Sequence, residues 1–460
     1  MSLKNLLGLF LCALAALIGG LSASPPDTAF AAGNSITSPD TTGDIGRWAS
    51  LRLDGFGFPV VSYYNRAEDR LKVLHCGDAN CIAGNSIVTP DPNTGLHTSL
   101  RLDSSGFPVV SYWDADAGTN DLKVLHCNDA NCAGGDESIT SPDTGGNVGQ
   151  WTSLALDGSG NPVVSYRDFT NNDLKVLHCN DANCAGGDES ITTPDSAGVV
   201  GSFTSLALDS GGNPVVSYCA QLPSFLCTDL KVLHCNDANC AGGDESITSP
   251  DTGGDVGGYT SLALDASGYP VVSYHDYTDT GLKVLHCNDA NCAGGDESIT
   301  SPDTAGVVGG YTSLRLDSSG NPVVSYCVLS VFTCEDLKVL HCGNPNCTAG
   351  NSITSPDTGG MVGESALALD ISGNPVVSYY DTTNGNLKLL HCSDTDCTGD
   401  KPVGGIAELP QVDHAPLDEP ASSGRGSAAA PIAGATGAAA VLASAVWYAR
   451  RRSRERPRGS

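Results

Sequence analysis

Basic residues are scarce in this sequence. Its 460 residues contain 23 Lys and Arg against 52 Asp and Glu, which gives a formal net charge of −29. A surface of this sign repels phosphate backbones, so we expect no nucleic-acid partner. The same charge suits solubility or the binding of divalent cations.

Helical periodicity is absent between residues 34 and 397, and long apolar runs are confined to the two ends of the chain. At the N-terminal end, Lys4 precedes an apolar stretch from Leu6 to Leu21, and Ala29-Phe30-Ala31 offers small residues for cleavage. This pattern is typical of a secretory signal peptide, which we predict over residues 1–31. The mature protein is then exported.

The second apolar run covers residues 427–449, which carry no charge. A transmembrane helix needs about twenty such residues. Trp447 and Tyr448 are aromatic residues of the kind found at the membrane–water interface, and the cluster of arginines that follows is typical of the cytoplasmic side. We therefore predict a single-pass protein of the cell membrane, with a transmembrane helix over 427–449, a basic cytoplasmic tail over 450–460 and the N-terminal domain outside. An Ala-rich soluble helix or a flexible tail is the alternative. Residues 398–426, rich in Pro, Gly and acidic residues, indicate an extended stalk.

One pattern recurs seven times along the chain. The string Leu-Lys-Val-Leu-His-Cys, or a close variant, places its histidine at His75, His126, His178, His234, His286, His341 and His391. A period of about fifty residues indicates stacked supersecondary units rather than one globular core.

Within the third copy, four runs of apolar, β-branched and aromatic residues are separated by clusters of Gly, Asn, Asp and Pro. The runs cover residues 152–157, 162–166, 174–179 and 189–193. This pattern predicts a four-stranded meander in each copy. Seven meanders predict an all-β fold, a seven-bladed β-propeller of four-stranded blades over residues 34–397. An open β-solenoid is the rival fold.

The phase of the repeats predicts how the ring closes. Residues 34–37 match the fourth strand of the other copies, whereas the last copy has no such strand after Cys397. We expect the N-terminal strand to pair with the third strand of the last blade, which would remove two exposed sheet edges.

The segment Leu-x-Leu-Asp-x-x-Gly-Asn-Pro-Val-Val, as at residues 154–164, resembles the strand-turn-strand of exported bacterial β-propeller repeat proteins in the broad NHL and sialidase-like style. The resemblance covers about residues 34–397 and implies the architecture only. The Asp-box ending in Trp and the arginine triad of sialidases are not found in the sequence, so the resemblance implies no such activity.

Cysteines occur in neighbouring pairs. Of the 19, Cys12 falls in the predicted signal peptide. In an exported chain, paired cysteines of this kind predict local disulfides. The predicted pairs are Cys76–Cys81, Cys127–Cys132, Cys179–Cys184, Cys219–Cys227, Cys235–Cys240, Cys287–Cys292, Cys327–Cys334, Cys342–Cys347 and Cys392–Cys397. Zinc held by Cys-x4-Cys and the adjacent His is the alternative, although a structural zinc site needs four ligands.

Two positions vary between copies near the upper face, the end of the ring that carries the loops after the second and fourth strands. The position before the first strand holds Trp48, His97, Trp151, Phe203, Tyr259, Tyr311 and Glu364, and the position after the Ser-Tyr pair holds Tyr64, Trp113, Arg167, Cys219, His275, Cys327 and Tyr380. Aromatic faces with a few polar groups suit sugars or peptides. The predicted ligand-binding residues are Trp48, Trp113, Trp151, Arg167, Tyr259, His275 and Tyr311. Packing between blades is the alternative role of the aromatic residues.

Most repeated charged residues have a structural explanation. An Asp precedes each first turn and is expected to bond to its own turn backbone, and the seven repeated histidines at strand ends are predicted to be structural. The carboxylates of Asp114, Asp116 and Asp121 are the better calcium candidates, although they lack the D-x-D-x-D-G spacing. No other cofactor or metal is predicted.

No catalytic pair can be assigned from the sequence. A glycosidase needs two carboxylates close together, whereas the singular residues Glu364, Arg167 and His275 lie in different copies. The sequence therefore favours a non-catalytic binding or adhesion module, anchored at the cell surface, for an extracellular glycan or protein. A membrane-anchored glycan hydrolase and a structural surface protein are the alternatives.

Overall fold

The computed structural model describes residues 33–399, apart from 117, 222–225 and 331–333. Every regular element in this range is a β-strand. The predicted signal peptide, transmembrane helix and basic tail lie outside the described residues, as does the stalk beyond residue 399. None of the described residues belongs to a helix that could span a bilayer.

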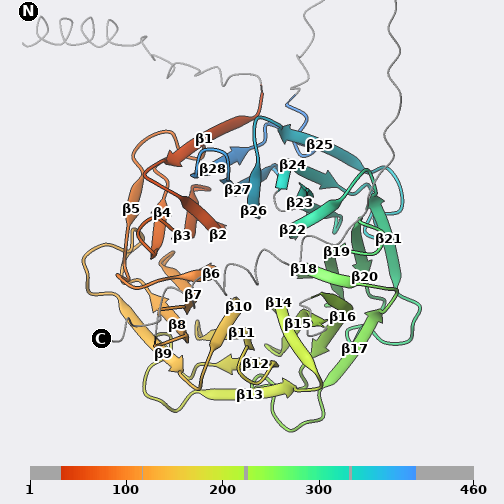
Figure 1. Cartoon of the computed structure of the whole chain (residues 1–460), viewed down its shortest axis with the longest axis horizontal. Helices are drawn as coiled ribbons and strands as arrows, with labels where there is room; N and C mark the ends of the chain where they lie inside the picture. The colour runs from red at the N-terminus through yellow and green to blue at the C-terminus, as the bar shows by residue number, and fades with distance from the viewer. Residues whose placement is uncertain (1–32, 117, 222–225, 331–333, 400–460) are drawn as a thin grey trace, which may run out of the picture. The chain divides into compact units, whose positions relative to one another are not determined.

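The first strand of each copy lies at the centre of the ring of sheets (Figure 1). These inner strands are β2 (Ile45–Leu53), β6 (Leu96–Leu102), β10 (Val148–Leu156), β14 (Val199–Leu208), β18 (Val256–Leu264), β22 (Val308–Leu316) and β26 (Val362–Leu369). Each ends at the predicted Asp turn. In the third copy, Asp157 Oδ1 accepts the backbone N–H groups of Ser159 and Asn161, both at 2.8 Å, which is the predicted turn role.

The second and third strands form the buried middle of each sheet. The second strands are β3 (Pro59–Asn65), β7 (Pro108–Asp114), β11 (Pro162–Asp168), β15 (Pro214–Gln221), β19 (Pro270–Asp276), β23 (Pro322–Leu329) and β27 (Pro375–Asp381). The third strands are β4 (Arg70–His75), β8 (Asp121–His126), β12 (Asp173–His178), β16 (Cys227–His234), β20 (Leu282–His286), β24 (Cys334–His341) and β28 (Asn386–His391). Most of their Val, Leu and Tyr side chains are buried between neighbouring sheets, where β-branched residues pack well.

The fourth strands lie on the rim (Figure 1). They are β1 (Ser35–Asp40), β5 (Ser86–Val88), β9 (Ser138–Asp143), β13 (Ser190–Asp195), β17 (Ser246–Asp251), β21 (Ser298–Asp303) and β25 (Ser352–Asp357). Their side chains alternate between exposed and partly buried positions, as in β13, because only one face of a rim strand packs on a neighbour.

The strand order gives five separate four-stranded sheets and one eight-stranded sheet. The larger sheet consists of β22–β25 and of β26–β28 with β1, joined by a single bridge between Cys334 and Val362. Repeated four-stranded sheets of this kind are consistent with a β-propeller.

β1 closes the ring, as the phase of the repeats predicts. It pairs antiparallel with β28, with Ser35 opposite His391 and Thr37 opposite Leu389. Asn34 reinforces the junction, because its Nδ2 donates to the Cys397 carbonyl at 3.1 Å and its Oδ1 accepts the Ser393 N–H at 3.0 Å. The two ends of an open solenoid would not pair in this way.

A buried Tyr-Asp-Lys cluster joins each sheet to the next. Asp303, at the end of β21, accepts hydrogen bonds from the Tyr326 hydroxyl and the Lys338 ammonium, both at 2.7 Å. These partners lie in β23 and β24. All seven copies repeat the arrangement, with Tyr–Asp distances of 2.6–2.7 Å and Lys–Asp distances of 2.7–3.0 Å. The buried charges are thus paired and hydrogen-bonded, as burial requires.

The repeated histidines make a second link, which confirms their predicted structural role. His234 Nε2 lies 3.1 Å from Asp209 Oδ2 in its own sheet, and Nδ1 lies 2.9 Å from Asn291 Oδ1 in the Cys loop of the next sheet. Each of the seven repeated histidines faces the turn Asp of its own copy in the same way.

All nine predicted cysteine pairs are disulfides in the structure. Their Cα atoms lie 4.9–5.6 Å apart, which suits a disulfide. Seven close the loop that follows a third strand, and two tie β15 to β16 and β23 to β24.

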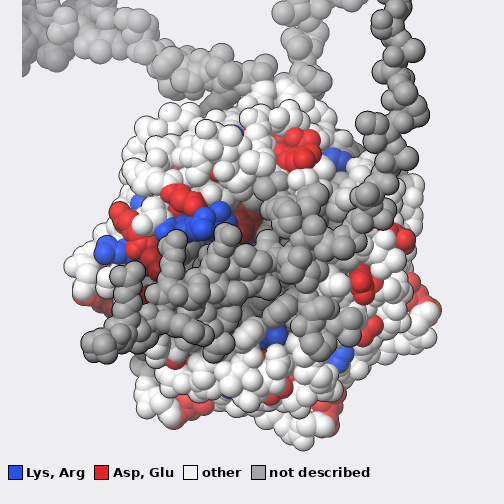
Figure 2. Space-filling view, in the orientation of Figure 1, with Lys and Arg blue, Asp and Glu red and all other residues white. Residues whose placement is uncertain are grey.

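Acidic side chains are spread around the rim of the face drawn in Figure 2, and basic side chains are fewer there. This distribution agrees with the net charge of −29. Against such an exterior, any group of basic residues inside the ring requires an explanation.

Candidate binding site at the channel mouth

Every inner strand carries a register irregularity near its start. The pairing of β10 with β11 shifts between Gln150 and Ser153, and the other inner strands shift at the corresponding place. The variable aromatic position lies inside this irregularity, not before the strand as the sequence suggests. A bulge of this kind re-aims the side chain that it carries.

Six of the seven residues at this position have a left-handed backbone. Their φ angles are 49° at Trp48, 53° at His97, 56° at Trp151, 55° at Phe203, 54° at Tyr259 and 51° at Tyr311. Bulky residues rarely adopt this region, at a cost of about 1–3 kcal/mol each. The surrounding structure must therefore hold each of them in place.

A threonine of the neighbouring inner strand donates to the backbone carbonyl of four of these residues, namely Trp48, Trp151, Phe203 and Tyr259. Thr204 Oγ1 donates to the Trp151 carbonyl at 2.7 Å, and Thr312 Oγ1 donates to the Tyr259 carbonyl at 2.7 Å. The same threonine contacts the buried serine of the preceding second strand, as Thr204 does with Ser165 at 2.9 Å. The strained backbone is thus fixed from the next sheet.

The seven side chains line one cavity of about 160 Å³ at the mouth of the channel. We name them the aromatic collar: Trp48, His97, Trp151, Phe203, Tyr259, Tyr311 and Glu364. Neighbouring rings contact one another, with centroids 4.2 Å apart for His97 and Trp151 and 4.4 Å apart for Tyr259 and Tyr311. Burial lowers the pKa of His97 to about 3, so its ring is uncharged at neutral pH. Each collar residue remains partly exposed, so the rings both pack between sheets and present surface to the cavity.

Glu364 interrupts the collar with a carboxylate. Its Oε2 has no hydrogen-bond partner among the described residues. Burial raises the pKa of Glu364, and the charge of Arg47 opposes this increase. Arg47 lies 4.5 Å from the Tyr380 ring centroid and donates to Asp44 Oδ1 at 3.4 Å. The mouth therefore has one polar side, where β26 meets β2.

The predicted ligand-binding residues fall into two groups. Trp48, Trp151, Tyr259 and Tyr311 line the cavity. Trp113 lies behind the collar, with its ring 5.7 Å from that of His97. The predicted set did not include His97, Phe203 and Glu364, although they occupy the same variable position as the four that line the cavity.

Arg167 and His275 do not line the cavity, and their contact with a ligand stays a prediction. They are 3% and 1% exposed, because they lie at the end of second strands that are covered on both faces. Arg167 donates to Ser202 Oγ at 2.7 Å and to Gln221 Oε1 at 2.8 Å. His275 Nδ1 lies 2.7 Å from the Val308 carbonyl, and burial lowers its pKa to about 4. Both residues support neighbouring strands.

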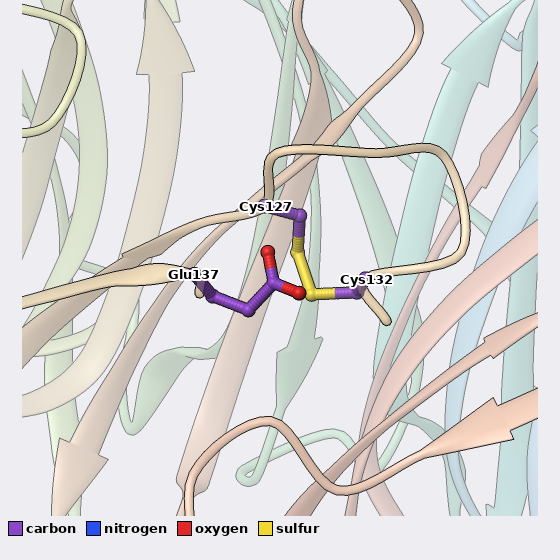
Figure 3. Close-up of side chains that lie close together, drawn as sticks. All are labelled: Cys127, Cys132 and Glu137. Carbon is purple, nitrogen blue, oxygen red and sulfur yellow. A yellow bond between two sulfur atoms is a disulfide. The ribbon is translucent and has the colours of Figure 1, made fainter. Parts of the chain in front are cut away.

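Among the described residues, four groups of two cysteines and a glutamate bring potential metal-ligand atoms close together. In Figure 3, Cys127 and Cys132 form a disulfide beside the carboxylate of Glu137. Metals bind thiolates, so these oxidised sulfurs are not ligands. The same disulfides exclude the zinc alternative for the Cys-x4-Cys segments in this structure.

The predicted calcium residues do not form a ligand cluster. Asp114 Oδ2 pairs with Lys123 Nζ at 2.8 Å. Burial, followed by the charge of Asp114, raises the pKa values of Asp116 and Asp121. Among the described residues, these three carboxylates are not within ligand distance of one another as a group. Calcium binding stays a prediction.

No family model matches the sequence, and no curated protein matches it. Among solved structures, the chain is similar to PorZ, a surface component of the type-IX secretion system of Porphyromonas gingivalis, with a TM-score of 0.47, 13% identity, and 75% of this chain and 46% of that chain covered. A puromycin hydrolase gives a TM-score of 0.46 and 14% identity, with 76% of this chain and 54% of that chain covered. The α-L-arabinofuranosidase of Fusarium graminearum gives a TM-score of 0.42 and 10% identity, with 64% of this chain and 91% of that chain covered. The chain spans about half the length of the first two proteins. These neighbours are β-propeller-like, and with TM-scores of 0.42–0.47 the likeness carries no argument about this chain.

Proposed function

We propose that the chain is an exported seven-bladed β-propeller that binds an extracellular glycan or protein at the aromatic collar, without catalysis. The blade count treats β22–β25 and β26–β28 with β1 as separate blades, since one bridge joins them. One observation carries the proposal: six bulky residues with left-handed backbones turn their side chains toward a single cavity. Strain of this kind gathers at ligand sites.

The chemistry of the collar favours a ligand with flat apolar faces and hydroxyl or amide groups. Indole and phenol rings offer stacking surfaces, and Glu364, which also lines the cavity, offers a carboxyl group for a hydrogen bond. A cavity of about 160 Å³ holds only a terminal group, such as one sugar ring or one side chain. The bulk of the ligand would then lie above the mouth.

A glycan hydrolase is the second candidate, because two carboxylates near the mouth have opposite pKa shifts. Burial raises the pKa of Glu364. For Asp44, burial also raises the pKa, but the Tyr380 hydrogen bond and the charges of Arg47 and Arg66 bring it below its usual value. Such divergence suits an acid and a base. Hydrolysis of a bound glycan that Glu364→Gln abolishes would favour this candidate over simple binding.

Replacing Trp151 tests the binding proposal. Full-length protein is screened on a glycan array, with and without calcium, and the dissociation constant of the best ligand is then measured for Trp151→Ala. Loss of a stacking ring should weaken binding by about 1 kcal/mol or more, which is about fivefold. Trp151→Phe keeps a ring, as Phe203 does in the next copy, and should retain part of the affinity.

Phe56→Ala is the matched control, because Phe56 is 84% exposed in the turn at the other end of the ring. It should leave the affinity unchanged. Equal affinities for wild type, Trp151→Ala and Trp151→Phe, with all three folded, would overturn the proposal. In that case the collar only packs the sheets together.

The membrane anchor is a separate proposal, since residues 427–449 lie outside the described residues. Full-length protein should fractionate with membranes and resist extraction by high salt, because screening weakens hydrophobic insertion little. Deleting residues 427–460 should release the protein into the medium. A truncated protein that stays with the membrane would contradict the anchor.

A further inference from the structure

A second cavity lies at the other end of the channel, where the inner strands end. It has a volume of about 430 Å³, and Leu and Ala side chains line most of it together with three arginines, Arg52, Arg101 and Arg315. Each arginine stands between the two leucines of a Leu-x-Leu-Asp segment, whereas the other four copies have Ala at that position. We name this space the arginine cavity.

The three arginines have no acidic partner within the part of the chain that the structure describes. Among the ion pairs of the described residues, none involves Arg52, Arg101 or Arg315. Each guanidinium donates from Nη1 to the carbonyl of the preceding residue: at 2.6 Å to Leu51, 2.9 Å to Leu100 and 2.6 Å to Leu314. A guanidinium has five N–H donors, so most donors stay free for a ligand.

The surroundings make these charges costly. Burial lowers the pKa of Arg101 to about 9, and repulsion from Arg315 contributes to this shift. Burial lowers the pKa of Arg315 to about 10. Both side chains are nevertheless charged at neutral pH. Like charges in an apolar cavity are unfavourable unless an opposite charge joins them.

The ring itself does not need these arginines. Ala155, Ala207, Ala263 and Ala368 fill the same position in the other copies, and their sheets have the same four-stranded order. A residue that every copy shares is explained by a structural role that every sheet shares, as with the Tyr-Asp-Lys cluster. Arginine in only three copies calls for a different explanation.

We propose that the arginine cavity binds a tetrahedral oxyanion, phosphate or sulfate, either free or as the terminal group of a small organic molecule. Arginine forks match the paired oxygens of such anions. The Leu and Ala side chains that line the cavity beside the guanidinium groups lower the local polarity, which strengthens the attraction to an anion. Since the cavity lies at the opposite end of the channel from the aromatic collar, the proposal is independent of ligand binding there.

The test measures anion binding to the full-length protein by calorimetry and by the shift in Tm. Inorganic phosphate, inorganic sulfate and a hexose phosphate are compared with sodium chloride at equal ionic strength. Phosphate or sulfate should raise Tm beyond the chloride control, because a ligand that binds only the folded state stabilises it. If the hexose phosphate binds more tightly than inorganic phosphate, the ligand is the terminal group of an organic molecule. If it binds equally or more weakly, the ligand is the free anion.

Arg101→Ala and Arg315→Ala introduce the residue that other copies carry, so we expect both variants to fold. Each variant should raise the dissociation constant for the anion at least tenfold, and the double variant should lose the anion-dependent shift in Tm. In chloride alone, each single variant should melt at or above the wild-type Tm, because it removes a repelling charge.

Arg66→Ala is the matched control, since Arg66 is half-exposed and pairs with Asp44 near the other end of the ring. It should leave the anion response unchanged. The same shift in Tm for phosphate, sulfate and chloride would overturn the proposal. So would a double variant that keeps the wild-type anion response, or alanine variants that melt earlier in chloride and still respond to the anion.

Discussion

Deleting residues 33–40 from the full-length chain is expected to lower the free energy of unfolding by at least about 3 kcal/mol and to make the protein associate. The deletion removes β1 and with it Asp40, which accepts hydrogen bonds from Tyr63 at 2.7 Å and from Lys72 at 2.9 Å. Leaving one partner of a buried ion pair without the other costs about 3–5 kcal/mol. Urea unfolding and size-exclusion chromatography at two protein concentrations measure both effects.

The lost backbone pairing adds to this cost. β28 would become an exposed edge, and an unpaired edge is a template for pairing with another chain. A peptide of residues 33–40 added to the deleted protein should restore the urea midpoint, since an extended peptide can add a strand to a free edge. The same peptide with proline in place of Ile36 should restore less.

Asp40→Ala in the intact chain separates the two contributions. It keeps the strand and removes the carboxylate, so we expect its urea midpoint to fall between those of the wild type and the deletion. A deleted protein that unfolds at the wild-type midpoint and stays monomeric would show that β1 does not close the ring.

The repeated residues made much of this fold predictable from the sequence. Because every copy ends its first strand with Leu-x-Leu-Asp and its third with His-Cys, the turns, the disulfides and the structural histidines could be read locally. The closure by residues 34–37 followed from repeat phase alone. The partners between sheets could not be read in this way, since Asp209, His234 and Asn291 meet only when one sheet packs on the next.

The candidate site was predictable in part. Trp151 and its equivalents were recognised as variable aromatic residues, but the bulge that aims them into the channel depends on pairing register, which local sequence does not specify. The sequence predicts polar contacts with a ligand for Arg167 and His275, because the position after the Ser-Tyr pair varies between copies. Packing on both faces buries them.

The arginine cavity was missed altogether. Singly, Arg52, Arg101 and Arg315 look like polar residues at strand ends. Only the ring geometry brings β2, β6 and β22 around the same channel. A comparison of the copies reveals them, because the position holds Arg in three copies and Ala in four while the leucines on either side are constant.

The second large effect is expected at Asp303. Asp303→Ala should destabilise the protein by about 3 kcal/mol, because it leaves the Lys338 ammonium and the Tyr326 hydroxyl without their buried acceptor. Asp303 is 4% exposed, and among the described residues Lys338 has no other ion-pair partner. Urea unfolding at pH 7 measures the change. Asp296→Ala, at an exposed site in the preceding loop, should change the free energy of unfolding by no more than about 0.5 kcal/mol.

A double variant tests whether the unpaired charge causes the loss. Asp303→Ala combined with Lys338→Met removes both charges and keeps an apolar chain of similar length. The pair should be less destabilised than Asp303→Ala alone, because no buried ammonium is left without a partner. A double variant that is less stable than either single variant would indicate lost packing instead.

The pH dependence of the Asp303 effect has a definite sign. Burial raises the pKa of Asp303, but the hydrogen bonds from Lys338, the Ala305 N–H and Tyr326 bring it below its usual value. A carboxyl group whose pKa is lower in the folded state stabilises that state above the unfolded pKa, which is about 3.9 for Asp, and loses this contribution as the pH falls through the folded pKa. The difference between wild type and Asp303→Ala should therefore be full at pH 7 and shrink below about pH 4. If it grew as the pH fell, the Asp303 carboxylate would not be the group that stabilises the junction between β21 and the next sheet.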